Sequence, residues 1–133
     1  MSVLLSIKPK YVEEIEKGAK LYEFRKTIFK KPTEEIWVYS SAPIKMIVGK
    51  IYIDSIIEDT PEMIWKTCKK YAGIEKKSFF KYFEGKERAY AIAIKKYEPF
   101  KKPINPYLKN NHFVPPQSYA YLSNVLPNAK VLA

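Results

Sequence analysis

The chain is organised around Lys17-Gly18-Ala19-Lys20-Leu21-Tyr22-Glu23-Phe24-Arg25-Lys26, a stretch that begins where a short helix must stop and continues as a strand. Side chains two residues apart on a strand share a face, so Glu23 and Arg25 should point the same way. The chain has 22 lysines and two arginines, so an arginine at this position indicates a specific role rather than a general surface charge. An acid fixed beside a cation suits a polar cleft that recognises or transforms a ligand, and it equally suits a buried ion pair.

A strand and a short helix precede this stretch. Val3, Leu5 and Ile7 alternate with their neighbours in the way that predicts a strand. Pro9 fits the first helical position, and the apolar spacing over residues 11–17 predicts a short amphipathic helix. Gly18 is the residue type that ends such a helix just beyond its C-cap.

Three further strands are predicted downstream, at residues 35–39, 44–57 and 88–97. Gly49 lies within the second of them and predicts a bulge or a sharp bend, as small barrels need at their corners.

Two helices are predicted between the last two of these strands. Thr60-Pro61-Glu62 predicts the start of the first helix. Threonine is a good N-cap residue, proline is favoured at the first helical position, and an acidic side chain is stabilising in the first turn. The second helix covers about residues 75–84 and ends at Gly85. Six of the ten prolines fall at or after Pro99, which predicts an irregular, proline-rich segment from there onward.

The predicted order of elements is β-α-β-β-β-α-α-β, which favours an α+β fold with a small mixed barrel and helices over its openings. A doubly wound α/β fold is excluded, because the connections between the middle strands are too short for parallel crossovers. At 133 residues, with no linker and no internal repeat, the chain is expected to form a single domain over 1–133 with its core at about 2–122.

The composition of the chain limits the classes of binding partner that are expected. The net charge is +10 and the sequence pI about 9.5, which favours polyanions such as RNA, although a solvated lysine-rich surface would look the same. No apolar run approaches the roughly 20 residues that span a bilayer, so no membrane partner is expected. A reducing cytoplasm is the expected location, and abundant Lys, Ile and Tyr beside a single Gln are typical of a thermophile.

Several classes of chemistry have no support in the sequence. The single Cys68 and the single His112 exclude a Cys/His zinc site. His112 stands alone in a Pro/Asn-rich loop, so no Ser-His-Asp arrangement is proposed and it is interpreted as a surface residue, while Cys68 on the apolar stripe of a helix is interpreted as core. Four scattered glycines form no phosphate-binding loop, so neither a metal nor a cofactor is predicted. Five lysine doublets could together track phosphates, and aromatic side chains such as Tyr39 and Tyr107 could stack on bases, although most aromatics are core.

A set of small polar and charged groups forms the candidate site. These groups stand near strand ends and loops, and burying them costs free energy unless they are paired or face a ligand. The predicted ligand-binding residues are Ser6, Lys8, Lys20, Glu23, Arg25, Ser40, Ser41 and Gln117.

At these residues the sequence resembles the ASCH domain family of the PUA-like superfamily, and within it the small archaeal-type members. The resemblance covers roughly residues 2–122. It rests on Leu5-Ser6-Ile7-Lys8-Pro9, on a G-x-K-x-x-E-x-R pattern over 18–25, and on Tyr39-Ser40-Ser41-Ala42-Pro43, Ile47-Val48-Gly49-Lys50 and Pro115-Pro116-Gln117-Ser118. It implies a pseudo-barrel of five or six strands, a cleft lined by the motif residues, and RNA binding linked to translation or transcription.

The resemblance also implies an alternative, because some bacterial members look like acetylcytidine amidohydrolases that use a Lys, a Thr three residues later and a downstream Glu. Here the lysine is Lys20, but Glu23 stands where the threonine would be, and the nearest downstream acid is Glu75. A carboxylate cannot simply replace an activated hydroxyl nucleophile. If the protein is an enzyme, Lys20 and Glu23 are its candidate acid/base pair.

The leading hypothesis is therefore an RNA-binding module for tRNA or single-stranded RNA that holds a nucleotide or a modified base in a basic polar cleft. In it Arg25 contacts phosphate or a base edge, and Glu23 orients Arg25 or accepts from an exocyclic amine. The alternatives are a small amidohydrolase acting on a modified nucleoside and a protein–protein adaptor with a merely solubilising charge.

Overall fold

The structure, a computed structural model, describes residues 1–129. The last four residues of the predicted domain, 130–133, lie outside the described residues. The elements in chain order are β1 (Ser2–Ile7), α1 (Pro9–Glu16), β2 (Tyr22–Arg25), β3 (Glu35–Ser40), β4 (Met46–Asp59), α2 (Pro61–Cys68), the 3₁₀ turn η1 (Lys69–Tyr71), α3 (Lys76–Tyr82), β5 (Ala89–Ile104), α4 (Pro106–Lys109), β6 (Ala120–Tyr121) and α5 (Leu122–Val125).

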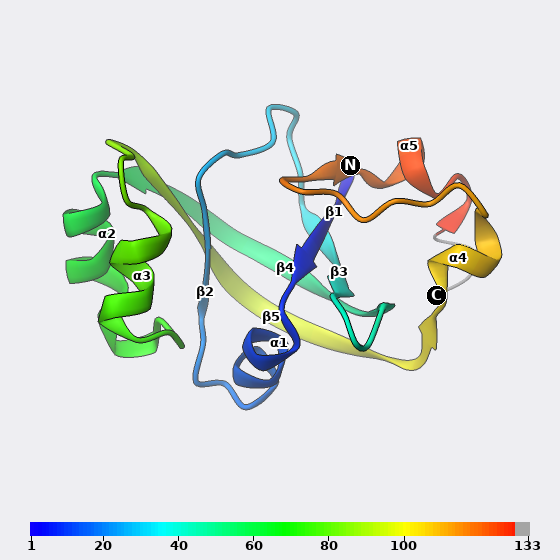
Figure 1. Cartoon of the computed structure of the whole chain (residues 1–133), viewed down its shortest axis with the longest axis horizontal. Helices are drawn as coiled ribbons and strands as arrows, with labels where there is room; N and C mark the ends of the chain where they lie inside the picture. The colour runs from blue at the N-terminus through cyan, green and yellow to red at the C-terminus, as the bar shows by residue number, and fades with distance from the viewer. Residues whose placement is uncertain (130–133) are drawn as a thin grey trace.

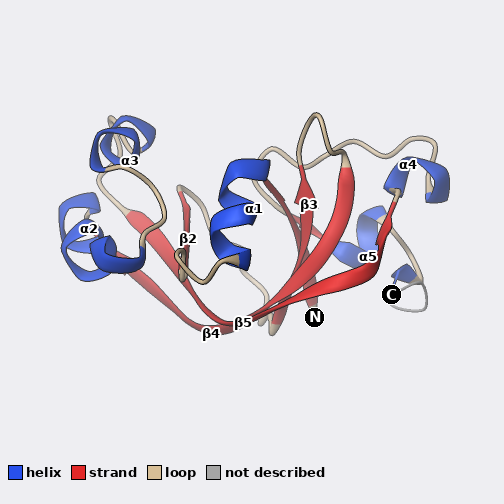
Figure 2. Cartoon of the chain, turned by 90° about the horizontal axis from the view of Figure 1, so that it is seen from below, coloured by secondary structure: helices blue, strands red, loops and turns tan. Residues whose placement is uncertain are grey.

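All six strands belong to one sheet, in the order β2-β5-β4-β3-β1-β6. Within residues 1–129, β1 and β3 pair in parallel and the other neighbouring strands pair antiparallel. The long strands β4 and β5 form a spine that runs the length of the molecule (Figure 1). The sheet curls around this spine, and α1 lies on its concave side (Figure 2). This arrangement confirms the predicted α+β class and the mixed, barrel-like sheet with covering helices.

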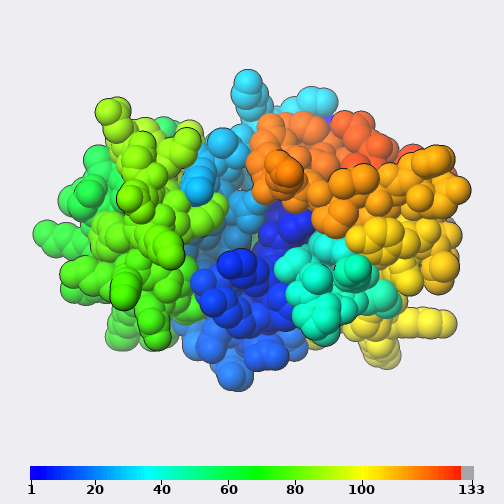
Figure 3. All heavy atoms as spheres, viewed as in Figure 1, coloured from blue at the N-terminus to red at the C-terminus, as the bar shows by residue number. Residues whose placement is uncertain are grey.

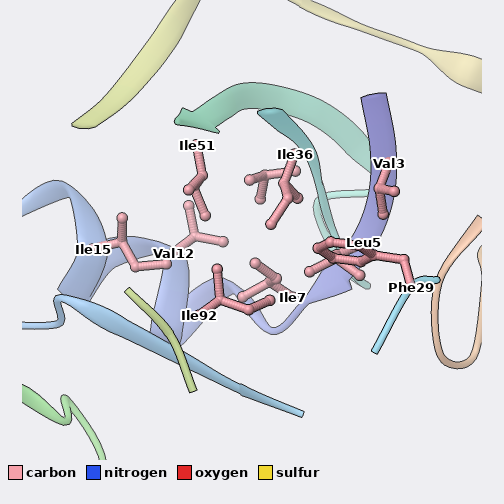
Figure 4. Close-up of a cluster of buried hydrophobic side chains, with 10 residues drawn as sticks. Val3, Leu5, Ile7, Val12, Ile15, Phe29, Ile36, Ile51 and Ile92 are labelled. Carbon is pink, nitrogen blue, oxygen red and sulfur yellow. The ribbon is translucent and has the colours of Figure 1, made fainter. Parts of the chain in front are cut away.

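The central core fills the inside of the curl (Figure 4). Val3, Leu5 and Ile7 point into it from alternate positions of β1, as the period of two requires. Val12 and Ile15 pack against them from α1, so the helix plugs one opening of the half-barrel. The remaining members of this cluster are Phe29, Ile36, Val38, Ile51 and Ile92.

A separate apolar cluster lies at each end of the molecule. Phe24 of β2 packs with Ile64, Cys68 and Phe79 under α2 and α3. Leu4, Trp37 and other residues pack with Leu122 and Leu126 at the opposite end, near α4 and α5. The half-barrel is thus closed at one end by the α2–η1–α3 segment, which matters below because it forms a wall of the site.

The predicted helix signals are confirmed. Thr60 caps α2, because its side-chain oxygen accepts from the Met63 backbone N–H at 3.3 Å. Pro9 and Pro61 stand at the first positions of α1 and α2. Gly18 follows the end of α1 with φ of +79°, a conformation that a residue with a side chain rarely adopts, and it directs the chain toward β2.

The bulge predicted at Gly49 is confirmed, since the β3–β4 and β4–β5 registers both shift beside it. The irregular segment predicted from Pro99 is wrong in its starting point, because β5 continues through Pro99 and Pro103 to Ile104. Beyond Ile94, β4 is the one strand of residues 1–129 that pairs with β5, so a proline without an N–H can face the open side.

Candidate functional site

Strands β1 and β2 are not neighbours in the sheet, yet the curl brings the end of one beside the other. Arg25 of β2 bridges the gap between these two strand ends, called the seam below. Its Nη1 donates to the Ser6 carbonyl oxygen at 3.4 Å and to Oε2 of Glu23 at 3.2 Å, and its Nη2 donates to the Ser118 carbonyl oxygen. The Ser6 hydroxyl adds a bond to the Pro116 carbonyl oxygen at 3.0 Å. Three chain segments therefore meet at one guanidinium group.

A cleft of about 550 Å³ opens beside this junction, within the roughly 300–1,000 Å³ range of small-ligand sites. Figure 3 shows the hollow at the centre of one face, between the green surface of α3, the blue surface of α1 and the orange surface of the segment before β6. The lining residues are Ser6, Ile7, Lys8, Lys10, Tyr11, Lys20, Glu23, Phe24, Arg25, Ile74, Ser78, Phe79, Lys81, Tyr82 and Gln117.

Six of the eight predicted site residues line this cleft: Ser6, Lys8, Lys20, Glu23, Arg25 and Gln117. Ser40 and Ser41 are absent from the lining. Ser40 is buried and pairs with Ile7 in the sheet, and the Ser41 backbone N–H donates to the Ile7 carbonyl oxygen at 3.0 Å. These two serines continue the β1–β3 pairing at the edge of the site.

Lys20 is the most buried cation of the cleft, at 2% exposure. Its Nζ donates to the Ala72 carbonyl oxygen at 2.8 Å and lies 4.6 Å from the centre of the Phe24 ring and 5.3 Å from that of Tyr11. Burial lowers the pKa of this ammonium group, while the nearby Glu23 carboxylate opposes the shift. The amine is therefore easier to deprotonate than an ordinary lysine.

Gly73 holds the stem of Lys20 in place. A side chain at Gly73 would collide with the Cβ and Cγ atoms of Lys20, and φ at this glycine is +63°. The tight approach lets the Ala72 carbonyl reach the ammonium group. The turn between η1 and α3 is thus shaped around one lysine.

Glu23 and Arg25 share a face of β2, which confirms the alternation predicted from the sequence. Their side chains are 8% and 12% exposed, so the ion pair is largely shielded from water. Both terminal nitrogens of Arg25 donate to protein oxygens. The geometry of Arg25 therefore suits a structural link between β1, β2 and the segment before β6 better than a bidentate contact to a phosphate.

The relatives of the chain place it in a family. No family model matches it. It is 31% identical over 123 residues to an ASCH domain-containing ribonuclease of Zymomonas mobilis, covering 90% of this chain and 82% of the relative. The chain belongs to the ASCH domain family.

Solved structures agree with this assignment. A crystal structure of the ASCH protein from Zymomonas mobilis superimposes with a TM-score of 0.83 at 28% identity, covering 91% of this chain and 87% of that one. A tyrosine-to-phenylalanine variant of it reaches 0.87 at 26% identity, over 98% and 96% of the two chains. The chain is also 28% identical over 106 residues to ribosomal protein uL22 of Ureaplasma parvum, covering 77% of this chain and 33% of that protein.

The cleft of this ASCH domain carries more positive charge than the sequence motif alone predicted. Lys10 and Tyr11 enter from α1, and Lys81 and Tyr82 enter from α3. With Lys8, Lys20 and Arg25, five cations face one carboxylate, Glu23. The lysines on the outer face of the second helix were visible in the sequence, but no local pattern indicated that this helix would stand over the motif.

Other residues noted in the sequence lie elsewhere in the ASCH domain. Tyr39 is buried, its hydroxyl is 2.7 Å from that of Tyr107, and both rings pack against Phe113, so this cluster is core rather than a stacking surface. Cys68, the last residue of α2, is buried as predicted, and burial raises the pKa of its thiol to about 11. His112 is exposed.

Two further findings concern ligands and membranes. Within residues 1–129, no group of three or more His, Cys, Asp and Glu side chains is arranged to hold a metal ion. Across the same residues, none of the helices has the length and apolarity needed to cross a membrane. Glu75, the candidate downstream acid of an amidohydrolase, is the N-cap residue of α3, is exposed and does not line the cleft.

Proposed function

We propose that the cleft of this ASCH domain binds RNA, with one nucleotide inside the cleft and its phosphate against the lysines at the rim. The observation that carries the proposal is the gathering of five cations and one carboxylate around a single hollow with aromatic walls. Phosphate neutralisation by lysine and arginine favours nucleic acids, and aromatic rings stack on unpaired bases. A relative named as a ribonuclease supports RNA over other polyanions.

The exposed lysines are the natural phosphate ligands. Lys8, Lys10 and Lys81 line the cleft, are exposed, and form no ion pair with any acid among residues 1–129. Their charges are therefore available to a ligand, whereas Arg25 is already engaged by protein oxygens. The lysine ammonium is a compact point charge on a flexible stem, so an exposed lysine can move to meet a phosphate.

The walls of the cleft suit a base. Tyr82 is 38% exposed and Tyr11 is half-buried, and both rings line the cleft, where a base can contact their exposed parts. Lysine ammonium groups already lie over these rings, that of Lys26 over Tyr82 at 4.5 Å and that of Lys10 over Tyr11 at 5.0 Å. Arg25 engages Oε2 of Glu23, which leaves Oε1 as an acceptor for an exocyclic amine or a ring N–H of the base. Cytosine, adenine and guanine carry such donors, and a modified base that keeps the donor would also fit.

The direct test compares two doubly substituted variants. Lys8→Gln with Lys10→Gln removes two charges at the cleft, and Lys101→Gln with Lys102→Gln removes two exposed charges from β5, outside the cleft lining. Binding of a fluorescent single-stranded RNA is measured by anisotropy over a salt series. The wild type should bind more weakly as salt rises, and the cleft variant should lose about 1.4 from the slope of log K against log salt. No RNA binding at low salt would end the proposal.

RNA cleavage is a second candidate, and the ribonuclease relative together with the Lys20–Glu23 pair favours it. In this reaction the ribose 2′-oxygen forms a bond to the adjacent phosphorus as the bond to the 5′-oxygen breaks. Glu23 takes the 2′-hydroxyl proton, and the Lys20 ammonium gives a proton to the departing 5′-oxygen. The products are a 2′,3′-cyclic phosphate and a 5′-hydroxyl, and proton return from Glu23 to Lys20 restores the site.

Cleavage is tested with two matched oligonucleotides, one all-RNA and one with a single 2′-deoxy residue at the cleaved position. Mass spectrometry should find cyclic phosphate ends from the first and no cleavage at the substituted position of the second. Lys20→Met and Glu23→Gln should each reduce the rate by about 10²–10⁴-fold, the usual contribution of a general acid or base. Equal cleavage of both oligonucleotides would exclude the 2′-hydroxyl as nucleophile.

The finer expectations remain part of the proposal. The partial similarity to a ribosomal protein supports a link to translation, with tRNA or single-stranded RNA as the partner in the cytoplasm. A single domain over residues 1–133, of the archaeal type within its family, also stays a prediction. The amidohydrolase alternative lacks a hydroxyl at Glu23 and a downstream acid in the cleft, and acetate release from acetylcytidine would be needed to revive it.

A further inference from the structure

The segment α2–η1–α3, called the helical cap below, carries a dense group of lysines. All of them are exposed, and none forms an ion pair among the described residues. They are Lys66, Lys69, Lys70, Lys76, Lys77 and Lys81. Over residues 66–86 seven bases stand against the two acids Glu75 and Glu84, so this end of the molecule is strongly positive.

The other lysine doublets are arranged differently. Lys95–Lys96 and Lys101–Lys102 lie on β5, where successive side chains point to opposite faces, so neither doublet concentrates its charge on one face. Lys96 also lies 3.9 Å from the Glu98 carboxylate. The ammonium group of Lys31 lies over the Tyr121 ring at 4.9 Å. In the helical cap, the ammonium group of Lys70 lies over the Tyr71 ring at 5.5 Å. Of the five doublets, Lys76–Lys77 on α3 therefore offers the most available charge.

The helical cap is continuous with the cleft. Lys81 and Tyr82 of α3 line the cleft, and Lys77 stands one helical turn before Lys81 on the same side of α3. The cap is also fastened to the cleft floor, because the Lys20 ammonium donates to the Ala72 carbonyl and the Leu21 N–H donates to the Tyr71 carbonyl at 2.9 Å. In Figure 3 the green surface of the cap borders the hollow directly.

We infer that the helical cap binds the phosphates of the RNA strand that flank the nucleotide held in the cleft. The inference rests on the proposed function and extends it from one nucleotide to a longer strand with a defined course, out of the cleft past Lys81 and along α3. The cap offers unpaired charge at spacings that a flexible strand can follow, and phosphates need no shaped pocket. An acidic protein is the competing occupant, and the experiment below separates the two.

The test uses a cap variant, Lys76→Gln with Lys77→Gln, beside the Lys101→Gln with Lys102→Gln control. All four lysines are exposed, and each double change removes two charges, so the two variants match in net charge and neither disturbs buried packing. Each protein is titrated with a single-stranded RNA of about 12 nucleotides, a length typical of such sites, and with a dinucleotide that occupies the cleft alone.

For the longer RNA, the slope of log K against log salt should be about 1.4 smaller in magnitude for the cap variant than for the wild type. Between 50 and 200 mM salt, the affinity of the wild type should therefore fall by a factor about sevenfold larger than that of the cap variant. Its dinucleotide affinity should equal that of the wild type, and the control should keep the wild-type slope. Equal slopes for the cap variant and the control would overturn the inference, because the attraction would then be diffuse.

Failure of the inference and failure of the proposed function are distinguishable. If Lys8→Gln with Lys10→Gln weakens both ligands while the cap variant weakens neither, the cleft binds RNA and the inference alone is wrong. If no variant changes binding, or no RNA binds, both fall. Wild-type RNA affinity in the cap variant, together with loss of binding to a polyglutamate peptide, would assign the cap to an acidic protein.

Discussion

Replacement of Arg25 by lysine should destabilise the protein far more than the same replacement at Arg88. These are the two arginines of the chain, so the two variants match in composition and charge. Arg25 spans the seam between β1, β2 and the segment before β6 through bonds to the Ser6 carbonyl, the Glu23 carboxylate and the Ser118 carbonyl. Arg88 makes an exposed ion pair with Glu58 at 3.5 Å, with both side chains about half exposed.

The magnitude follows from these contacts. A lysine at position 25 keeps one ion pair but has a single nitrogen, so it cannot reach carbonyl oxygens in two other segments at the same time. Hydrogen bonds to charged groups contribute about 1.5–3 kcal/mol each, and the 3.4 Å bond to Ser6 lies at the weak end, so the loss should be about 2–3 kcal/mol. For a domain of this size that lowers Tm by about 8–12 °C. The exposed Arg88 pair should lose less than about 0.5 kcal/mol.

Thermal and urea unfolding of the two variants measure this difference directly. Hydrogen exchange shows where the stability is lost: in Arg25→Lys the amides of residues 117–121 should exchange faster, because that segment loses its anchor, while those of α2 keep their protection. Equal falls in Tm for the two variants would contradict this prediction, and so would exchange that accelerates uniformly. Either result would mean that the shielded guanidinium is not the strut that closes the seam.

Two further outcomes are expected. Gly73→Ala should lower the free energy of unfolding in urea more than Gly85→Ala, and it should also weaken RNA binding. Both glycines have positive φ, but only at Gly73 would an added side chain collide with Lys20. Equal losses of stability in the two variants would mean that the contact with Lys20 does not contribute to stability. Because burial raises the pKa of the Cys68 thiol to about 11, its iodoacetamide labelling at pH 9 should be at least about 50-fold slower in the native protein than in urea, since far less thiolate is present. Because the unfolded thiol ionises first, this group should lower the free energy of unfolding as pH rises from about 9 to about 11, and Cys68→Ala should remove that loss, which pH-dependent urea unfolding would reveal.

Most of the helices and strands before Pro99, and the local geometry of the Glu23/Arg25 motif, could be predicted from the sequence, whereas α4, β6 and α5 were not predicted. Proline at the first helical position, the Thr60 cap and the helix-ending Gly18 act within a few residues of where they stand, so they could be read without a structure. The shared face of Glu23 and Arg25 follows from the period of a strand in the same way. The charge of the molecule is a sum over the sequence and needs no fold.

Which further residues surround the motif depends on packing between segments that are far apart in the sequence. The bond from Arg25 to Ser118 joins positions 93 apart in the chain, and it exists because the sheet curls until β2 faces β1. The same curl excludes Ser40 and Ser41 from the cleft and brings in Lys10, Lys81 and Tyr82. Pro99 could join β5 because one side of the strand is open there, which its own sequence does not record. Local patterns fix conformation over a few residues, whereas packing between distant segments selects the walls of a cleft.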